Sequence, residues 1–98
     1  MKCLLALIVK PSLEAALSDW LLLHPQIDGF TSQLASGHGA GHAMSISEQV
    51  EGQRKQMIYW LELDDERVKT VLDDLSSSFS GAEIHYWQLP LTASGIIR

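Results

Sequence analysis

The sequence predicts a single α+β domain in which two helices cover one face of a four-stranded antiparallel sheet. Three observations support this fold class. The 98 residues suit one domain (1–98), and no break in composition divides them. Apolar residues run continuously or alternate in four short segments, as in strands, and recur at helical spacing in two others. The order of these segments is β-α-β, a long polar connection, and again β-α-β.

The first half of the chain predicts a strand, a helix and a second strand. Residues 3–9 are a continuous apolar run, which is typical of a central strand covered on both faces. Ser12 is placed to cap the helix that follows, and Pro25 ends that helix by forcing His24 out of the helical conformation. We expect a turn at Asp28–Gly29 and a weaker strand over 30–36. The apolar stripe of the helix consists of Leu13, Ala16, Leu17, Trp20 and Leu21.

The second half repeats the pattern. Residues 53–63 alternate, with Met57, Tyr59, Leu61 and Leu63 on one strand face and Ile58, Trp60 and Glu62 on the other. Asp64 or Asp65 is expected to cap a second helix, whose buried stripe is Val68, Val71, Leu72 and Leu75. The serine run 76–78 and Gly81 end it, and the last strand is predicted over 82–89.

The connection 37–52 is the segment in which function is expected first. It is polar and rich in glycine, and structureless loops longer than about 12–15 residues are uncommon in compact domains unless they are functional. Within it, Ser45 and Glu48 match a capping box, so we expect a short helical turn that ends at Gly52.

The predicted strands carry large apolar groups on both faces, although two helices cover only one. Trp60 lies opposite Tyr59 in the strand alternation, and Trp87 opposite Tyr86. If this apolar sheet face were left in water, it would form a patch larger than those that soluble monomers usually expose. We therefore expect a homo-oligomer in which the sheets face one another, and the apolar face alone does not choose between a dimer and a trimer.

Charge and composition exclude some functions. The formal net charge is −5 with only seven Lys and Arg, which argues against a nucleic-acid surface. Cys3 is the single cysteine, so no intrachain disulfide forms, as suits a reducing cytosol. The apolar run 3–9 is far shorter than the roughly 20 residues of a membrane-spanning helix, and no cleavage site for a signal peptide follows it. We expect a cytoplasmic protein that is not inserted in a membrane.

The element order and the long connection resemble those of PII-like signalling proteins, which are ferredoxin-like trimers, so the resemblance implies a trimer in preference to a dimer. Their protruding loop engages partner proteins, and their inter-subunit clefts bind small ligands. At the level of motifs, the chain is similar to a family of unknown function within that group. The resemblance implies a cytosolic regulator that acts on a membrane efflux pump or its regulator, because members are commonly encoded beside heavy-metal efflux systems. The motifs that carry it are DGFTS (28–32), SGHG (36–39), His42, SxxEQVxG (45–52) and HYWxLP (85–90).

The histidines of the connection are candidate metal ligands. His38 and His42 lie four residues apart, and neutral imidazoles suit Zn²⁺, Cu²⁺ or Ni²⁺. Glu48, Glu51, His85 or the same residues of another subunit are candidates for the remaining ligands. The alternative is that the two histidines are exposed loop residues without a metal, and that His85 is a hydrogen-bonded interface residue.

A second candidate site is a small-ligand cleft between subunits. Gly37, Gly39 and Gly41 form a glycine run whose backbone N–H groups suit a phosphate. Arg54 and Lys55 follow the connection and have the charge to pair with such an anion. Glycines that only permit turns, and a solvated strand end, are the simpler interpretation. Trp60 or Trp87 are candidates to line a cleft for a flat ligand.

Catalysis has little support in the sequence. No Ser-His-Asp or Cys-His pattern is present, the pair Asp64–Asp65 is accounted for as a helix cap, and Asp73–Asp74 as a solvated helix face. The functions that remain are a regulatory or metal-binding module that senses through 37–52, a PII-like sensor of a small molecule or nucleotide, and a protein-interaction subunit. We do not expect an enzyme.

Overall fold

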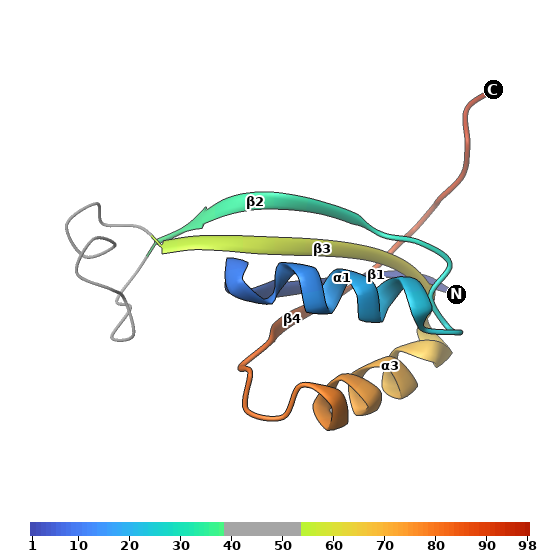
Figure 1. The fold of residues 1–98 in the computed structure, drawn as a ribbon. Helices are drawn as coiled ribbons and strands as arrows, with labels where there is room; N and C mark the ends of the chain where they lie inside the picture. Colours follow the sequence, from blue (N-terminus) through green and yellow to red (C-terminus); the bar gives the residue numbers. More distant parts are fainter. Residues whose placement is uncertain (39–53) are drawn as a thin grey trace.

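A four-stranded antiparallel sheet with both helices on one face forms the framework of the protein in a computed structural model, which describes residues 1–38 and 54–98. The strand order is β2-β3-β1-β4, as in a ferredoxin-like arrangement, and the predicted fold class is confirmed. Figure 1 shows the two helices on the same side of the sheet. The elements are β1 (Lys2–Val9), a 3-10 turn (Pro11–Leu13), α1 (Glu14–Leu23), β2 (Thr31–Gly37), β3 (Arg54–Asp64), α3 (Asp65–Ser78) and β4 (His85–Pro90).

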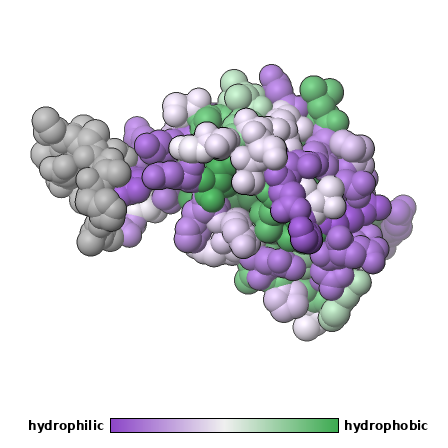
Figure 2. All heavy atoms as spheres, turned by 90° about the horizontal axis from the view of Figure 1, so that it is seen from below, coloured by the Kyte–Doolittle hydropathy of each residue, from purple (hydrophilic) through white to green (hydrophobic). Residues whose placement is uncertain are grey.

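The core lies between the sheet and the helices. Alternate residues of β1 and β3 face the helices and are almost fully buried, and Tyr59, Leu5 and Leu7 are among the residues with no exposed surface. The helices contribute Leu17 and Leu21 of α1 and Val68, Val71 and Leu75 of α3. Of the other residues in the predicted stripes, Leu13, Trp20 and Leu72 are partly buried against the core and Ala16 is exposed. Seen from this helix side, the surface shows mostly hydrophilic side chains with smaller hydrophobic areas between them (Figure 2).

Tyr59 ties the sheet to α1 through polar contacts inside this core. Its hydroxyl donates to the Glu14 carbonyl oxygen at 3.2 Å and lies 3.0 Å from the Ser18 hydroxyl oxygen. Its ring lies against Phe30, with ring centroids 5.6 Å apart. A buried phenol needs such partners, since an unpaired hydroxyl in the core is costly.

Two local predictions in the first half are wrong. Ser12 does not cap α1. Pro11 instead opens a 3-10 turn in which the Leu13 N–H donates to the Lys10 carbonyl at 3.0 Å, and Leu13 takes the cap position. The turn after α1 lies at Pro25–Gln26 and not at residues 28–29. It forms there because His24 takes an extended conformation at the end of the helix, as expected before a proline.

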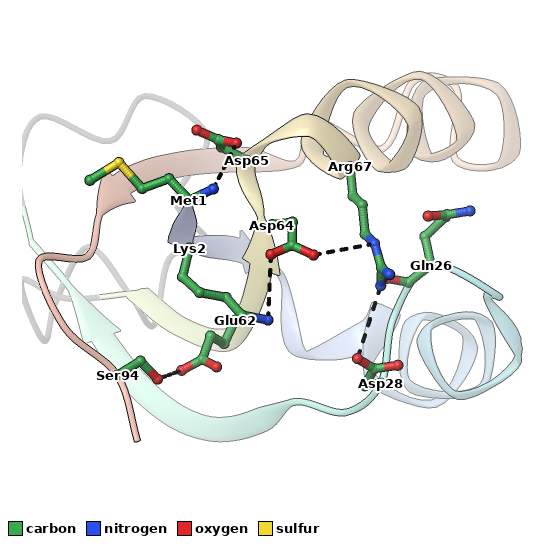
Figure 3. A network of polar contacts seen from close by, with 9 residues as sticks. All are labelled: Met1, Lys2, Gln26, Asp28, Glu62, Asp64, Asp65, Arg67 and Ser94. Atoms are coloured by element: carbon green, nitrogen blue, oxygen red, sulfur yellow. Dashed lines mark hydrogen bonds and ion pairs between the residues drawn. The ribbon is translucent and has the colours of Figure 1, made fainter. Parts of the chain in front are cut away.

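One capping contact and one boundary in the second half differ as well. Asp64 takes the N-cap position of α3, but its carboxylate makes no capping hydrogen bond. It pairs with Lys2 at 3.6 Å and with Arg67 at 3.8 Å instead (Figure 3). The last strand begins at His85 and not at residue 82, because Glu83 has a φ of 55°, which is incompatible with a strand.

The face of the sheet away from the helices, called the open face below, carries no described helix. Sheet register places alternate residues there: Leu4, Ala6 and Ile8 of β1, Ile58, Trp60 and Glu62 of β3, and His85, Trp87 and Leu89 of β4. This confirms that Tyr59 and Trp60 point to opposite faces. In the described part of the chain, neither helix is long and apolar enough to cross a membrane.

Candidate functional site

The β2–β3 ribbon extends beyond the rest of the sheet and leaves a step. The last pair between β1 and β3 is Val9 with Met57, whereas β2 and β3 stay paired to Gly37 and Arg54. On the far side of β1, β4 begins at His85, opposite Ile8. A hollow of about 340 Å³ lies at this step, which we call the step hollow. Its lining residues are Ile8, Val9, Lys10, Arg54, Lys55, Gln56, Ile58, Glu83, His85 and Trp87.

Strand alternation explains which side chains surround the step hollow. His85 and Trp87 lie on the open face of β4, with ring centroids 6.0 Å apart and planes at 84°. Arg54 lies two residues from Gln56 and four from Ile58, so the three share the open face of β3. Lys55 has the opposite parity and reaches the step from the other face, while Lys10 follows the last residue of β1 directly.

The step hollow concentrates positive charge in an acidic protein. The formal net charge is −5, yet Lys10, Arg54 and Lys55, three of the seven basic residues, line this one hollow. In the described part of the chain, none of the three forms an ion pair with a carboxylate. A basic hollow of this kind attracts anions.

The other lysines, and the arginine of α3, are paired with carboxylates. Lys2 contacts Asp64, and Arg67 lies 3.8 Å from Asp64 and 4.0 Å from Asp28. Lys69 donates a hydrogen bond to Asp73 at 2.7 Å, which raises the pKa of its ammonium group. The cations of the step hollow therefore differ from Lys2, Arg67 and Lys69, whose charge is compensated by neighbouring carboxylates.

Among the described residues, Glu83 is the one carboxylate that lines the step hollow, and its backbone is strained. Its φ of 55° lies in the left-handed region, which a non-glycine residue rarely adopts. Strained residues of this kind cluster at functional sites. Glu83 makes no ion pair with Lys10, Arg54 or Lys55 in the described structure.

The sequence-predicted ligand residues are only partly assembled. Arg54 and Lys55 lie in the step hollow as described. Gly37 ends β2, and its missing side chain leaves room for Gln56, whose Cδ would lie 2.7 Å from a Cβ at this position. Gly37 therefore serves a close approach between side chain and backbone. Gly39 and Gly41 lie outside the described residues.

The predicted metal ligands are separated within one chain. His38 follows β2 and is exposed, whereas His85 lies on β4. In the sheet, β4 is three strands away from β2, and the two histidines are offset by about five residues along the strand direction. Strand spacing and rise put the two on the order of 20 Å apart. Within residues 1–38 and 54–98 no group of three His, Cys, Asp or Glu side chains is placed to hold a metal ion. His42, Glu48 and Glu51 lie outside the described residues, as does the helical turn expected at 45–52.

Lys10 and Glu83 belong to the site, and sequence reasoning missed both. Lys10 ends the apolar run of β1 and precedes Pro11. In the sequence, this pattern indicates only the end of a strand. Glu83 precedes β4 without any distinguishing pattern. The signal that could have found them is register: a strand pairing that places Val9 opposite Met57 puts Lys10 beside Gln56.

Two other polar groups have structural explanations. His24 at the end of α1 donates from Nε2 to the Asp74 carboxylate at 2.7 Å and accepts from the Gln26 N–H through Nδ1. It thereby links α1 to α3. Cys3 is buried beneath Gln88, and burial, followed by the nearby Asp65 carboxylate, raises the pKa of its thiol. This agrees with the expectation of an inert thiol.

A second hollow, of about 470 Å³, lies between α3 and β4. Its walls include Leu72, Phe79, Ile84 and Tyr86, and its charged lining residues are Asp73 and Glu83. It is larger than the step hollow, but none of its described lining residues is basic, so it is poorly suited to an anion. The step hollow is therefore the better candidate site.

Comparison with known proteins agrees with the fold. A family model described as "Protein of unknown function (DUF3240)" matches residues 1–98. The crystal structure of a DUF3240 family protein from Shewanella baltica OS155 is similar to this chain, with a TM-score of 0.80 and 18% identity. The similarity covers 99% of this chain and 97% of that one. No curated protein matches the chain.

Proposed function

The chain belongs to the DUF3240 family of proteins of unknown function, and on this premise we propose that it is a non-enzymatic, PII-like sensor of a small phosphate-bearing ligand. The observation that carries the function is the step hollow, where three cations without an ion pair among the described residues meet an exposed indole. The ligand would bind there, at the base of the connection between β2 and β3.

Charge supports the phosphate part of the ligand. Lys10, Arg54 and Lys55 supply donors without an acceptor of their own in the described structure. Arginine and lysine bind phosphate by charge-assisted hydrogen bonds, and an arginine can do so with two parallel bonds. A carboxylate ligand accepts hydrogen bonds from the same donors, but a ligand with two or more phosphate groups has enough negative charge to pair with all three cations.

The aromatic side chains support a flat ring in the same ligand. Trp87 is 48% exposed, and its indole lies beside the hollow instead of in the core. An exposed indole is a surface on which a nucleobase can stack. The volume of about 340 Å³ falls in the range of small-molecule sites. A nucleoside di- or triphosphate therefore fits the chemistry of the site best.

The position of the step hollow supports a regulatory role. Gly37 and Arg54 are the last pair of the β2–β3 ribbon, so the site adjoins both ends of the segment 39–53. A ligand that binds one arrangement of that segment better than another would shift the balance between them. The resemblance to PII-like proteins suggests that the segment then acts on a membrane efflux pump or its regulator.

Isothermal titration with ATP and with pyrophosphate tests this function. In the Lys10→Gln/Lys55→Gln variant the dissociation constant should rise about 10- to 30-fold, because each lost charge contributes on the order of 1 kcal/mol. The Lys2→Gln/Lys69→Gln variant changes the net charge equally but touches neither the hollow nor its residues, and it should bind as the wild type does. Absence of binding by the wild type, or an equal loss in both variants, would refute the assignment.

We also propose a transition-metal function as the second candidate, through His38 and His42. The observation that favours it is the position of His38, which is exposed and follows the end of β2. His42 is four residues further along the chain, and further ligands would come from Glu48 or from another subunit. Titration with Zn²⁺, Cu²⁺ and Ni²⁺ should give binding that His38→Ala/His42→Ala abolishes, and equal binding by wild type and variant would exclude it.

A further inference from the structure

The step hollow has two chemically different sides. In the sheet, β1 lies between β3 and β4, and its Ile8 pairs with His85 of β4 at the step. The β3 side and the β4 side of the hollow are therefore two strand spacings apart, on the order of 10 Å. Arg54 and Lys55 line the β3 side, whereas Trp87 lies on the β4 side. A ligand that contacts both sides extends across the end of β1.

Glu83 is the feature of the β4 side that phosphate binding does not explain. It precedes β4 by two residues and also lines the hollow between α3 and β4, so it belongs to the wall that separates the two hollows. Within residues 1–38 and 54–98 its carboxylate pairs with no cation. A carboxylate accepts hydrogen bonds and repels a phosphate group. A ligand held by the cations therefore gains affinity if it places N–H donors against Glu83.

The Trp87 indole directs the flat ring of such a ligand to the same side. The indole is 48% exposed, and its perpendicular contact with the His85 ring, at 84° and 6.0 Å between centroids, holds its orientation. A base that stacks on Trp87 points its phosphates across the end of β1 toward Arg54 and Lys55. The group that meets Glu83 is then the edge of the base.

We propose that Glu83 is a specificity-determining residue that selects guanine nucleotides over adenine nucleotides in the step hollow. This inference rests on the proposed function, because it concerns the base of the nucleotide that binds there. Guanine presents two neighbouring donors, N1–H and N2–H₂, which match the two oxygens of one carboxylate. Adenine presents one donor, N6–H₂, beside the acceptor N1. A carboxylate therefore accepts one hydrogen bond from adenine and repels the neighbouring lone pair.

A carboxylate can also act on the phosphate end of a nucleotide, through a bridging divalent cation. The place of Glu83 on the β4 side, across the end of β1 from Arg54, favours the base. The two roles differ in what they change. A contact through the phosphates affects GTP and ATP by the same factor, whereas a contact with the base changes the ratio of their affinities.

Isothermal titration with GTP, inosine triphosphate and ATP in the presence of EDTA tests the selection. The wild type should bind GTP at least about tenfold more tightly than ATP, because a lost hydrogen bond to a charged group costs that factor or more. Inosine triphosphate keeps N1–H but lacks the N2 amino group, so its affinity should lie between those of GTP and ATP.

Glu83→Gln exchanges one acceptor for a donor while it keeps the shape of the side chain. The glutamine amide complements N1 and N6–H₂ of adenine, so this variant should bind ATP more tightly than the wild type does, and GTP at least about tenfold more weakly. Its affinity for pyrophosphate, which has no base, should not fall, and this result shows that the hollow is intact. Glu66→Gln is the matched control, because Glu66 is exposed on α3 and does not line the hollow. This control should keep the wild-type preference.

Three results would overturn the selection: equal affinities of the wild type for GTP and ATP, a preference that Glu83→Gln leaves unchanged, or an equal change for both nucleotides in that variant. If ATP and pyrophosphate bind in these cases, the proposed function stands and only the selection of guanine fails. Binding of none of GTP, ATP and pyrophosphate by the wild type would refute both.

Discussion

Removing the Tyr59 hydroxyl should destabilise the protein by about 1–2 kcal/mol. Tyr59→Phe keeps the buried ring and its contact with Phe30 but deletes the hydroxyl oxygen that links β3 to α1. Because the Tyr59 hydroxyl donates to the Glu14 carbonyl, the Ser18 hydroxyl must donate to Tyr59. In the variant, Ser18 loses its acceptor inside a partly buried environment, and Glu14 loses a donor.

Urea denaturation at a fixed protein concentration measures this loss. The midpoint should fall with an unchanged m-value, and the melting temperature should drop by about 4–8 °C for each kcal/mol in a domain of this size. Ser18→Ala alone should cost less, about 0.5–1 kcal/mol, because only one of the two contacts is removed. Ser77→Ala on α3, where Ser77 is exposed, is the control and should change little.

The double variant decides whether the two hydroxyls act together. Tyr59→Phe/Ser18→Ala should cost less than the sum of the single changes, by about 0.5–1 kcal/mol of coupling. Strict additivity would show that the Ser18–Tyr59 contact at 3.0 Å contributes nothing net. A Tyr59→Phe variant as stable as the wild type would show the same of this contact and the bond to Glu14 at 3.2 Å together. Either result would refute the reasoning.

Three further results are expected. Burial raises the pKa of the Cys3 thiol, so at pH 8 this thiol should react with iodoacetamide more than about tenfold more slowly in the folded protein than in urea-unfolded protein. Above the ordinary thiol pKa of 9.0 the folded state keeps a proton that the unfolded state has lost. The free energy of unfolding should therefore fall as the pH rises above that value. His24→Ala should cost about 1–2 kcal/mol in urea denaturation, because it breaks the bonds to Asp74 and Gln26, and an unchanged midpoint would contradict that role. Glu83→Gly should leave the free energy of unfolding unchanged or raise it by up to about 1 kcal/mol, since glycine tolerates a φ of 55°. The same variant should bind ATP more tightly, because it removes the carboxylate from the step hollow. Weaker ATP binding would contradict this.

The strand faces could be predicted from the sequence because alternation is a local signal. The two-residue period of β3 separates Tyr59 from Trp60, and the structure places the first in the core and the second on the open face. The same holds for the α3 stripe. These assignments depend only on where apolar side chains recur, which the fold must satisfy.

Elements that depend on backbone detail or on tertiary contacts could not be predicted in the same way. Ser12 has the chemistry of a cap, but Pro11 forms a 3-10 turn that moves the helix start to Glu14. Nothing in the composition around Glu83 indicates a positive φ, so the start of β4 was placed too early. Asp64 was correctly placed at the cap position, but its carboxylate contacts Lys2, which only the folded sheet brings near.

The candidate site shows the same division. Arg54 and Lys55 were identified from their position after the connection, and both line the step hollow. Lys10 was not, because its place in the site depends on the register between β1 and β3 and on β4 beginning at the same step. Residues that are distant in sequence become neighbours only through strand pairing.

The most direct measurement of the central claim is an NMR titration of the ¹⁵N-labelled protein with ATP. The account predicts saturable shifts of the Trp87 indole N–H and of the Lys10, Arg54 and Lys55 amides, while the Trp20 indole, which packs against His24 and Phe79 on the helix side, stays in place. Shifts that are absent, that never saturate, or that centre on Trp20 would contradict it.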